Sequence, residues 1–455
     1  MAVTDSVLAF IDAAAADPST ALHTLVVRDP RGIQVEAYWD PYRRDDRQLV
    51  YSVSKTFTAT AAGFAIAEGL LHLEDRVVDL LEPPHPVTGR RLELTLHHLL
   101  SMSTGHDADS IAFTPGPQGD VAAEFWRTDP QTPVGSRHVY NNGASWAIGE
   151  IVRRVTGQTL TDYLRPRLLQ PIGIDIDWER DVLGGELGWS GVHITTPDLA
   201  AFAQLYASGG RWQGEQVLPE GWAELAGTRH IRTDDRADSG SEWLYGYGYQ
   251  VWMSRQGFRM DGAHGQYALI LPEQETVIAI TSAEPVTSQP LLDLVWEHLV
   301  PGLGTPASAL RAERLADLSL PIPRDAGSYG SWHHAGPVPV RPSLGLGADQ
   351  SPVPDLSDVS VIRDAAGFTV DLRVDGEPVT LTTPGPWRRQ PLRTGGIDVP
   401  VALAAAITSR GGVRLRLCMT DTVHVLLVDL DDKGGGLAWQ TTPLHMGRFA
   451  DLSAP

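Results

Sequence analysis

A stretch rich in proline, alanine and leucine at residues 301–325 divides the chain into two parts with different sequence patterns. Before this connector, strand-like segments lie near both ends and enclose a mostly helical middle. These segments are residues 22–27, 33–39, 267–271 and 276–281. Strands that open and close a helical region are typical of one antiparallel sheet flanked by helices. We therefore expect an α+β domain at residues 1–305.

Residues 326–455 consist of short strand-like segments separated by glycine and aspartate turns. Many short strands at even spacing are typical of a barrel or a sandwich. We expect a small all-β domain here, barrel-like and similar to a lipocalin. A chain of 455 residues is long enough for two such domains.

The charge of the chain excludes some partners. Its formal net charge is −20, which argues against nucleic acid and anionic membrane surfaces, because both require clustered lysine and arginine. No apolar run predicts a membrane-spanning helix, and the first residues lack the pattern of a signal peptide. We therefore expect a cytoplasmic protein with no membrane or nucleic-acid partner.

The single cysteine, Cys418, allows no intramolecular disulfide. We expect no metal and no cofactor.

Lysine is almost absent. Lysine and arginine together number 36, yet only Lys55 and Lys433 are lysines. An arginine cannot give up its proton in a protein, whereas a buried lysine can. A lysine kept in such a chain therefore indicates a position that requires an amine able to lose its proton.

Ser52 and Lys55 form an S-x-x-K motif at the start of an apolar segment that we expect to be a buried helix, residues 52–69. Residues three apart lie on one helical face, so the hydroxyl and the amine can meet. The helix N-terminus and the apolar setting both favour a neutral amine, which can take the serine proton. The alternative is a serine cap and a lysine that extends to solvent. Ser54 cannot replace Ser52 in this argument, because adjacent residues on a helix point in different directions and Lys55 is its immediate neighbour.

Two further segments offer polar groups. Tyr140 and Asn142 precede a helix-like segment, and a tyrosine hydroxyl near a lysine ionises more readily and can relay protons. The alternative is a turn with a packed tyrosine. The glycine-rich segment 260–266 leads into a strand, and an exposed N–H there could join that of Ser52 in an oxyanion hole. The alternative is a plain turn before a hairpin.

These three segments, in this order, resemble the serine β-lactamase and penicillin-binding-protein superfamily, in particular class C β-lactamases and the esterases and D-amino-acid peptidases that share their fold. The resemblance covers residues 5–300 and implies a β-lactamase-like domain. In that family the serine is acylated, and the counterparts of Lys55 and Tyr140 move protons. Asn142 corresponds to a residue that binds lysine and substrate. Further matching segments are 99–107 (LLSMSTGHD), 134–135 (VG), 156–157 (TG), 165–173 (RPRLLQPIG) and 246–252 (GYGYQVW).

One motif departs from the family. Its β-lactamases and transpeptidases carry K-T-G, whose lysine helps to bind the β-lactam carboxylate, whereas residues 260–262 read Met-Asp-Gly. The resemblance assigns the second oxyanion N–H to Ala263. His264 follows, either as an additional base or as a packed side chain. Without the cation, we do not expect an efficient β-lactamase.

The resemblance leaves three functions open. The first is a serine hydrolase that acts through an acyl-Ser52 intermediate on an ester or a small or D-configured amide. The second is a thioesterase of the penicillin-binding-protein type, which passes a peptidyl group to an amine and cyclises it. Its substrate could be presented by a carrier protein. The third is a sensor module that is acylated but does not turn over.

Overall fold

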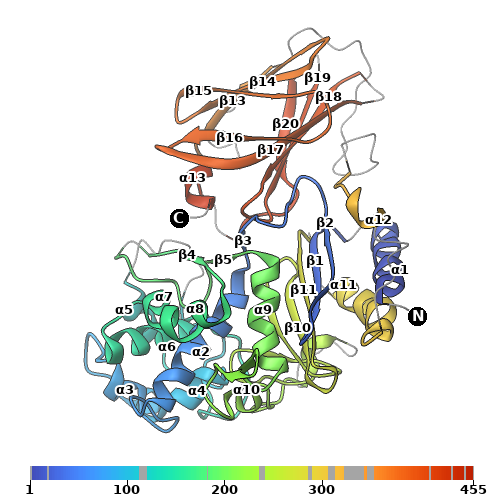
Figure 1. Ribbon diagram of the computed structural model, residues 1–455. Helices are drawn as coiled ribbons and strands as arrows, with labels where there is room; N and C mark the ends of the chain where they lie inside the picture. Colours follow the sequence, from blue (N-terminus) through green and yellow to red (C-terminus); the bar gives the residue numbers. More distant parts are fainter. Residues whose placement is uncertain are drawn as a thin grey trace.

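The computed structural model describes residues 3–17, 20–111, 120–181, 183–234, 241–284, 289–305, 313–321, 343–345, 353–408, 411–431, 434–444 and 447–453. A six-stranded sheet organises the N-terminal part, in the order β2-β1-β11-β10-β9-β8, with every neighbouring pair antiparallel. Strands from the two ends of this part therefore lie side by side (Figure 1). The strands are β1 (Leu22–Asp29), β2 (Gly32–Tyr38), β8 (Trp252–Met253), β9 (Phe258–Gly262), β10 (Gln266–Leu271) and β11 (Thr276–Ser282).

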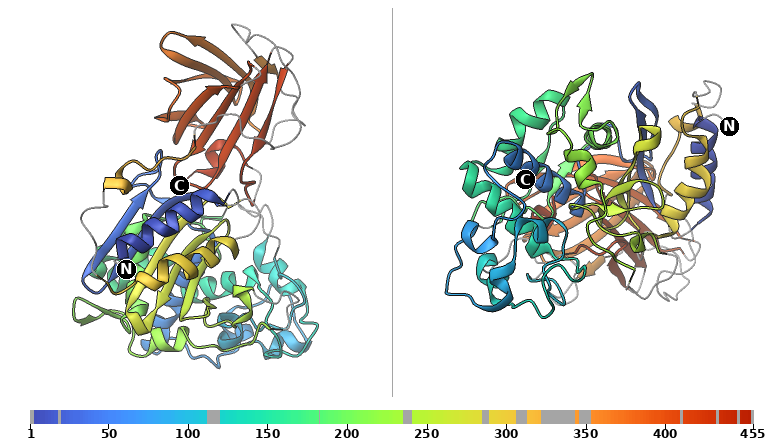
Figure 2. Two further views of the ribbon diagram at one scale, coloured as in Figure 1. Left: turned by 90° about the vertical axis from the view of Figure 1, so that its right-hand side faces the viewer. Right: turned by 90° about the horizontal axis from the view of Figure 1, so that it is seen from below.

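Helices cover both faces of this sheet, which explains why its central strands are apolar throughout. Successive residues of β1 point to opposite faces, yet Leu25, Val26 and Val27 are all buried. Val26 packs in one hydrophobic core with α9 (Thr196–Ala207), and its two neighbours pack in another with α1 (Val3–Ala16) and α11 (Gln289–Leu294). The second group of helices lies in front of the sheet in Figure 2, left.

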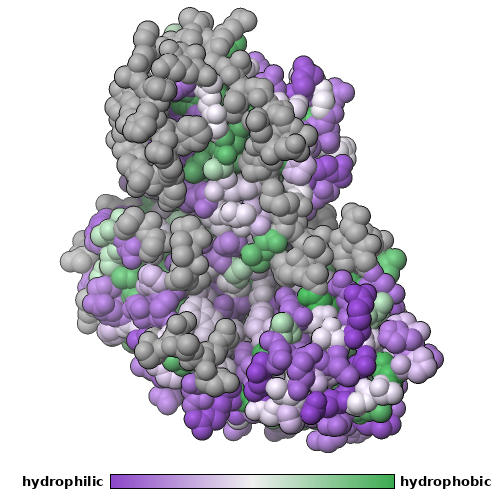
Figure 3. Space-filling model, turned by 180° about the vertical axis from the view of Figure 1, so that it is seen from behind, coloured by the Kyte–Doolittle hydropathy of each residue, from purple (hydrophilic) through white to green (hydrophobic). Residues whose placement is uncertain are grey.

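A helical subdomain lies beside the face of the sheet that α9 covers (Figure 1). Its central helix, α2 (Ser54–Ala67), packs against α6 (Asn142–Thr156), and α6 also packs against α4 (Leu96–Leu100). The expected α+β domain with a β-lactamase-like arrangement is therefore present. No helix in the described ranges is long and apolar enough to cross a membrane. In Figure 3, the coloured residues of this domain are mostly hydrophilic, and hydrophobic ones are scattered.

The C-terminal part is built of strands apart from one short helix, α13 (Phe449–Leu452), but it is not a closed barrel. Its strands form a four-stranded sheet, β12-β13-β14-β15, and a five-stranded sheet, β16-β17-β18-β19-β20. Within the described residues no backbone ladder joins the sheets, which share a core between their facing sides. The strands are β12 (Ser343–Gly345), β13 (Leu356–Asp364), β14 (Gly367–Val374), β15 (Glu377–Thr383), β16 (Arg388–Thr394), β17 (Ile397–Ile407), β18 (Val413–Met419), β19 (Val425–Asp431) and β20 (Gly434–Trp439).

The barrel prediction was wrong, because within the described residues the strands form two separate sheets and no ladder joins β15 to β16 or β12 to β20. The two sheets bury their apolar faces against one another in a shared core, so the domain does not need closure to cover them. The strand pattern alone could not exclude closure, because barrels and packed sheets both alternate buried and exposed residues.

Candidate active site

Ser52 lies in a short 3₁₀ turn, η1 (Tyr51–Val53), which leads directly into α2. Its side chain is partly exposed, whereas Lys55, one turn further on, is only 1% exposed. Lys55 Nζ lies 2.9 Å from Ser52 Oγ. The structure thus brings the S-x-x-K pair into hydrogen-bond contact, with the hydroxyl at the surface and the amine sealed beneath it.

The amine of Lys55 has two further partners. Nζ lies 2.7 Å from Asn142 Oδ1 and 2.7 Å from the main-chain oxygen of Trp189. Both atoms can only accept, so a neutral amine gives them its two hydrogens. Its lone pair is then left for the hydroxyl of Ser52, which is the arrangement a general base needs.

Burial supplies the neutral amine. It lowers the pKa of Lys55 from 10.5 to about 7, while the negative charges of Asp109 and Asp261 act in the opposite direction and raise it. Desolvation is the largest of these effects. A substantial fraction of Lys55 is therefore neutral near pH 7, as the sequence led us to expect.

Asn142 is held in the orientation that Lys55 requires. It begins α6, whose N-cap Asn141 accepts a hydrogen bond from Ala144 N. Asn142 Nδ2 donates to Asp109 Oδ2 at 2.6 Å, and Gly143 N donates to Asp109 Oδ1 at 3.2 Å. Because a carboxylate only accepts, the NH₂ group of Asn142 faces Asp109 and its oxygen faces Lys55.

Tyr140 completes the group around Ser52. Its hydroxyl is hydrogen-bonded to Ser52, and its ring centroid lies 4.9 Å from Lys55 Nζ. The ring stacks on Trp252 with centroids 5.9 Å apart and an interplanar angle of 11°. Burial raises the pKa of Tyr140 well above its usual 10, and the bond to Ser52 offsets this only in part. The expected shift of Tyr140 towards easier ionisation is therefore not found, because desolvation by burial sets the direction of its pKa.

The third segment approaches Ser52 along β9. A side chain at Gly262, the last residue of this strand, would collide with the main-chain oxygen of Val50, just before η1. Glycine is therefore what lets the strand lie against the turn that carries Ser52. Ala263 follows and packs in a small cluster with Leu49 and Tyr51.

His264 belongs to the same turn but has different neighbours. It takes a positive φ of +63°. Its Nδ1 lies 3.3 Å from the main-chain oxygen of Glu284, and its ring meets Tyr51 edge-on at a centroid distance of 5.5 Å. Burial lowers its pKa. The hydrogen bonds described for His264 do not connect it to Ser52 or Lys55, and its Nε2 is buried without a hydrogen-bond partner among the described residues.

Three groups near the nucleophile had no assigned role in the sequence. The Trp189 carbonyl and Asp109 orient Lys55 and Asn142, and no local pattern marks either of them. Asp261 is different, since a carboxylate in place of a small polar residue within the third motif is a visible signal. Its Oδ2 lies 2.9 Å from Nε of the fully buried Arg259. The described residues contain no group of three or more acidic, histidine or cysteine side chains arranged to hold a metal ion.

Ser54 cannot act as the nucleophile. Its hydroxyl is fully buried, donates to the main-chain oxygen of Tyr51, and accepts from Val192 N at 2.9 Å. These bonds use the hydroxyl to hold the first turn of α2. The spacing argument against Ser54 agrees with this structural role.

The model of a family described as Beta-lactamase matches residues 13–300. The chain belongs to the beta-lactamase family. Within this serine hydrolase family, it is 27% identical over 330 residues to penicillin-binding protein 4 of Amycolatopsis lactamdurans, covering 63% of the chain and 84% of that protein. It is also 27% identical over 294 residues to a 6-aminohexanoate-dimer hydrolase of Paenarthrobacter ureafaciens, covering 56% of the chain and 71% of that protein.

The beta-lactamase family match ends near the connector, but structural similarity continues past it. The octameric penicillin-binding-protein homologue from Pyrococcus abyssi superposes with a TM-score of 0.52 at 16% identity. The match covers 89% of this chain and 96% of that one, so it includes much of the C-terminal domain. At this identity, the similarity concerns the fold alone.

Proposed function

We propose that this protein is a hydrolase that forms an acyl-enzyme on Ser52 from an ester or from a small or D-configured amide. The observation that carries the proposal is the set of contacts around Lys55. Two acceptors take the hydrogens of the neutral amine, so its lone pair is available to Ser52 alone.

Acylation starts when Ser52 Oγ attacks the substrate carbonyl carbon and its proton passes to Lys55 Nζ. The N–H groups of Ser52 and Ala263 stabilise the resulting oxyanion, and one such donor contributes about 3 kcal/mol to lowering the barrier. The bond to the leaving group then breaks. Tyr140 protonates that group and recovers a proton from Lys55.

In deacylation, water is the attacking group and Lys55 again takes its proton. Water attacks the acyl carbon and gives a proton to Lys55, which returns it to Ser52 Oγ as the carboxylic acid leaves. The raised pKa of Tyr140 supports its part in the cycle, because the phenol stays protonated and can donate.

The charges near Ser52 favour substrates without a carboxylate beside the scissile bond. Met260, in place of the K-T-G lysine, is fully buried and uncharged. The side chain of Asp261 is 12% exposed, and its negative charge acts on both Lys55 and Tyr140. The cation paired with it, Arg259, is 0% exposed. We therefore propose that neutral or cationic substrates react faster than anionic ones such as β-lactams.

A fluorophosphonate probe tests the acyl-enzyme. We expect labelling of the wild type, none of Ser52→Ala, and almost none of Lys55→Arg, because arginine cannot take the proton. Ser54→Ala is the matched control and should still be labelled. An unlabelled wild type would refute the proposal.

Substrate choice is tested with p-nitrophenyl esters that differ only in an ammonium, a neutral or a carboxylate terminus, with nitrocefin for comparison. We expect the carboxylate ester and nitrocefin to react most slowly. In Asp261→Asn, the difference in rate between the carboxylate ester and the other two esters should become smaller. Equal rates for the three esters contradict the role of charge.

With a peptidyl thioester, a linear acid as product supports hydrolysis, whereas a ring indicates a cyclase. A stoichiometric burst without turnover indicates a sensor.

A further inference from the structure

The residue before the nucleophile has an unfavourable backbone conformation. Tyr51 has a φ of +47°, a left-handed conformation that costs a bulky residue on the order of 1 kcal/mol or more. Such a residue stays in place only if its surroundings hold it. Because Tyr51 and Ser52 share a peptide bond, a change at Tyr51 redirects both the hydroxyl and the N–H of Ser52.

The C-terminal domain holds the side chain of Tyr51. Its hydroxyl lies 2.8 Å from Nε2 of His424, which precedes β19, and the two side chains are 1% and 0% exposed. Nδ1 of His424 lies 3.3 Å from the main-chain oxygen of Thr441, which can only accept. Nδ1 therefore carries the hydrogen, and in a neutral ring Nε2 accepts from Tyr51.

The turn that carries His424 is itself fixed to the catalytic domain. The main-chain oxygen of Asp421 accepts from Leu49 N at 2.9 Å and lies 3.1 Å from His193 Nδ1. Val423 is fully buried in the cluster that contains Leu49 and Tyr51. The hydrogen bond to Tyr51 thus comes from a turn that the N-terminal domain also contacts at Asp421 and Val423.

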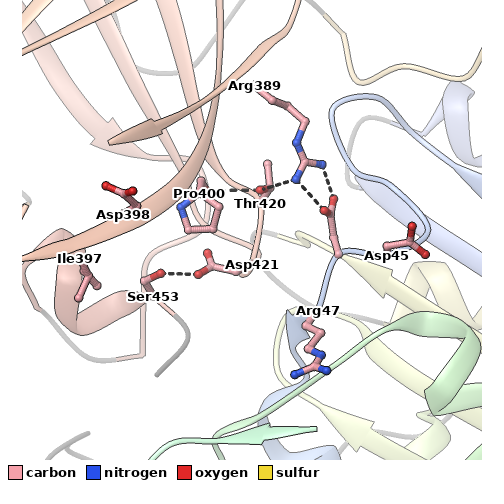
Figure 4. Close-up of a pocket in the computed structure, with 10 residues that line it drawn as sticks. Asp45, Arg47, Arg389, Ile397, Asp398, Pro400, Thr420, Asp421 and Ser453 are labelled. Carbon is pink, nitrogen blue, oxygen red and sulfur yellow. Dashed lines mark hydrogen bonds and ion pairs between the residues drawn. The ribbon is translucent and has the colours of Figure 1, made fainter. Parts of the chain in front are cut away.

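A second contact reinforces this attachment. Arg389, in β16, donates two hydrogen bonds of 2.6 Å to the carboxylate of Asp46, six residues before the nucleophile. Figure 4 shows Arg389 and Thr420 on the C-terminal side of this contact and the loop with Asp45 opposite. A cavity of about 410 Å³ lies beside it.

We propose that His424 is a positioning residue for the nucleophile, so that the C-terminal domain completes the active site. The hydrogen bond from Tyr51 to His424 keeps Tyr51 in its left-handed conformation and thereby aims the hydroxyl and the N–H of Ser52. His424 touches neither Ser52 nor Lys55 in the contacts described, so it acts through Tyr51. This inference rests on the proposed acyl-enzyme function.

Removal of either partner of this hydrogen bond should therefore slow acylation without weakening substrate binding. For Tyr51→Phe and His424→Leu, we expect kcat for a neutral p-nitrophenyl ester, and the rate of fluorophosphonate labelling, to fall about tenfold, which corresponds to about 1.4 kcal/mol. KM should stay within about twofold. The double variant should be no slower than either single one, because both remove the same bond.

Two further variants separate positioning from simple domain attachment. His424→Gln can accept from Tyr51 through its amide oxygen and should recover most of the lost kcat. Tyr42→Phe is the matched control, because Tyr42 is also buried and donates to the same turn, at the main-chain oxygen of Thr422 (3.4 Å). It should leave kcat unchanged. Thermal unfolding of each variant shows whether it is folded, and if His424→Leu does not fold, the near-isosteric Tyr51→Phe decides.

Any of three results would overturn the positioning role. These are a wild-type kcat in Tyr51→Phe, an equal loss of kcat in Tyr42→Phe, and additive losses of kcat in the double variant. An unlabelled wild type would instead refute the acyl-enzyme itself. The two failures are therefore distinguishable.

Discussion

At the scale of single residues, the chemistry depends on where the two hydrogens of a neutral Lys55 go. Asn142 Oδ1 and the Trp189 carbonyl take them, which leaves the lone pair for Ser52. Asp109 maintains this arrangement indirectly. It accepts a hydrogen bond from the amide of Asn142 and so fixes the orientation of that amide. An arginine in place of Lys55 would fill these contacts but would keep its proton.

The activity should follow the protonation of Lys55. We expect kcat/KM for a neutral ester to rise about tenfold per pH unit below pH 7 and to level off above it, because only the neutral amine is a base. Burial lowers this pKa to about 7, so the base form exists at pH values where an exposed lysine would be almost wholly protonated. Initial rates between about pH 5 and 9 test this. A profile without a transition near pH 7 would contradict the assignment of Lys55.

Asp109→Asn should move the same transition to lower pH. The negative charge of Asp109 raises the pKa of Lys55, so removing that charge lowers the pKa further. kcat should also fall, because an amide at 109 no longer forces the oxygen of Asn142 towards Lys55. Asp107→Asn is a suitable control, since Asp107 pairs with Arg137 at 3.0 Å and not with Asn142. A shift to higher pH in Asp109→Asn would refute this electrostatic account.

At the scale of elements, the site depends on the close approach of β9 to η1. The apolar segment at 52–69 was expected to be one helix, but α2 begins at Ser54 and a separate turn presents Ser52. That turn lies against the end of β9, where Gly262 meets the main-chain oxygen of Val50. The two N–H groups of the proposed oxyanion hole therefore come from elements about 210 residues apart, brought together by sheet topology.

Gly262→Ala should impair the site more than the fold. The added Cβ would collide with backbone, which cannot move aside as a side chain can. We expect the rate of fluorophosphonate labelling to fall at least tenfold, about 1.4 kcal/mol. Gly185→Ala is the control, because its nearest atoms belong to the Asp181 side chain at 3.3 Å or more. Unchanged labelling in Gly262→Ala would show that β9 does not need to lie so close.

At the scale of the whole molecule, the two domains are connected by more than the chain between them. Apolar side chains of the C-terminal domain, including Cys418 and Val425, share a hydrophobic core with Trp39 and Tyr42. The ion pair between Arg389 and Asp46 adds a charged contact whose side chains are 24% and 11% exposed. The domain therefore contributes to the shape of the segment that leads to Ser52.

Arg389→Ala should weaken this attachment. Hydrogen bonds to charged groups contribute about 1.5–3 kcal/mol, and the truncation leaves Asp46 without this partner. We expect a lower midpoint of urea unfolding together with a lower kcat. Arg393→Ala removes an exposed ion pair to Asp398 from the same strand and should change neither. A drop in stability without any change in kcat would separate domain attachment from the geometry of Ser52.

The sequence by itself determined the fold class of the N-terminal domain and which side chains to look for at its candidate active site. Strand-like segments at both ends of one region predict an antiparallel sheet, and a serine three residues before a scarce lysine predicts that the two side chains meet. Tyr140 and Asn142 were singled out by their place before a helix-like segment and by the resemblance to the family. The structure brings both side chains to Ser52 and Lys55, and their catalytic roles stay a prediction.

Only the tertiary structure decided how those groups behave. The hydrogen-bond partners of Lys55, the direction of the Tyr140 pKa and the contact of Tyr51 with His424 all depend on residues distant in sequence. The same holds for the two separate sheets of the C-terminal domain, since alternation of buried and exposed residues suits a barrel equally well. Desolvation and directional hydrogen bonds depend on the complete surroundings of a side chain, and only folding assembles those surroundings.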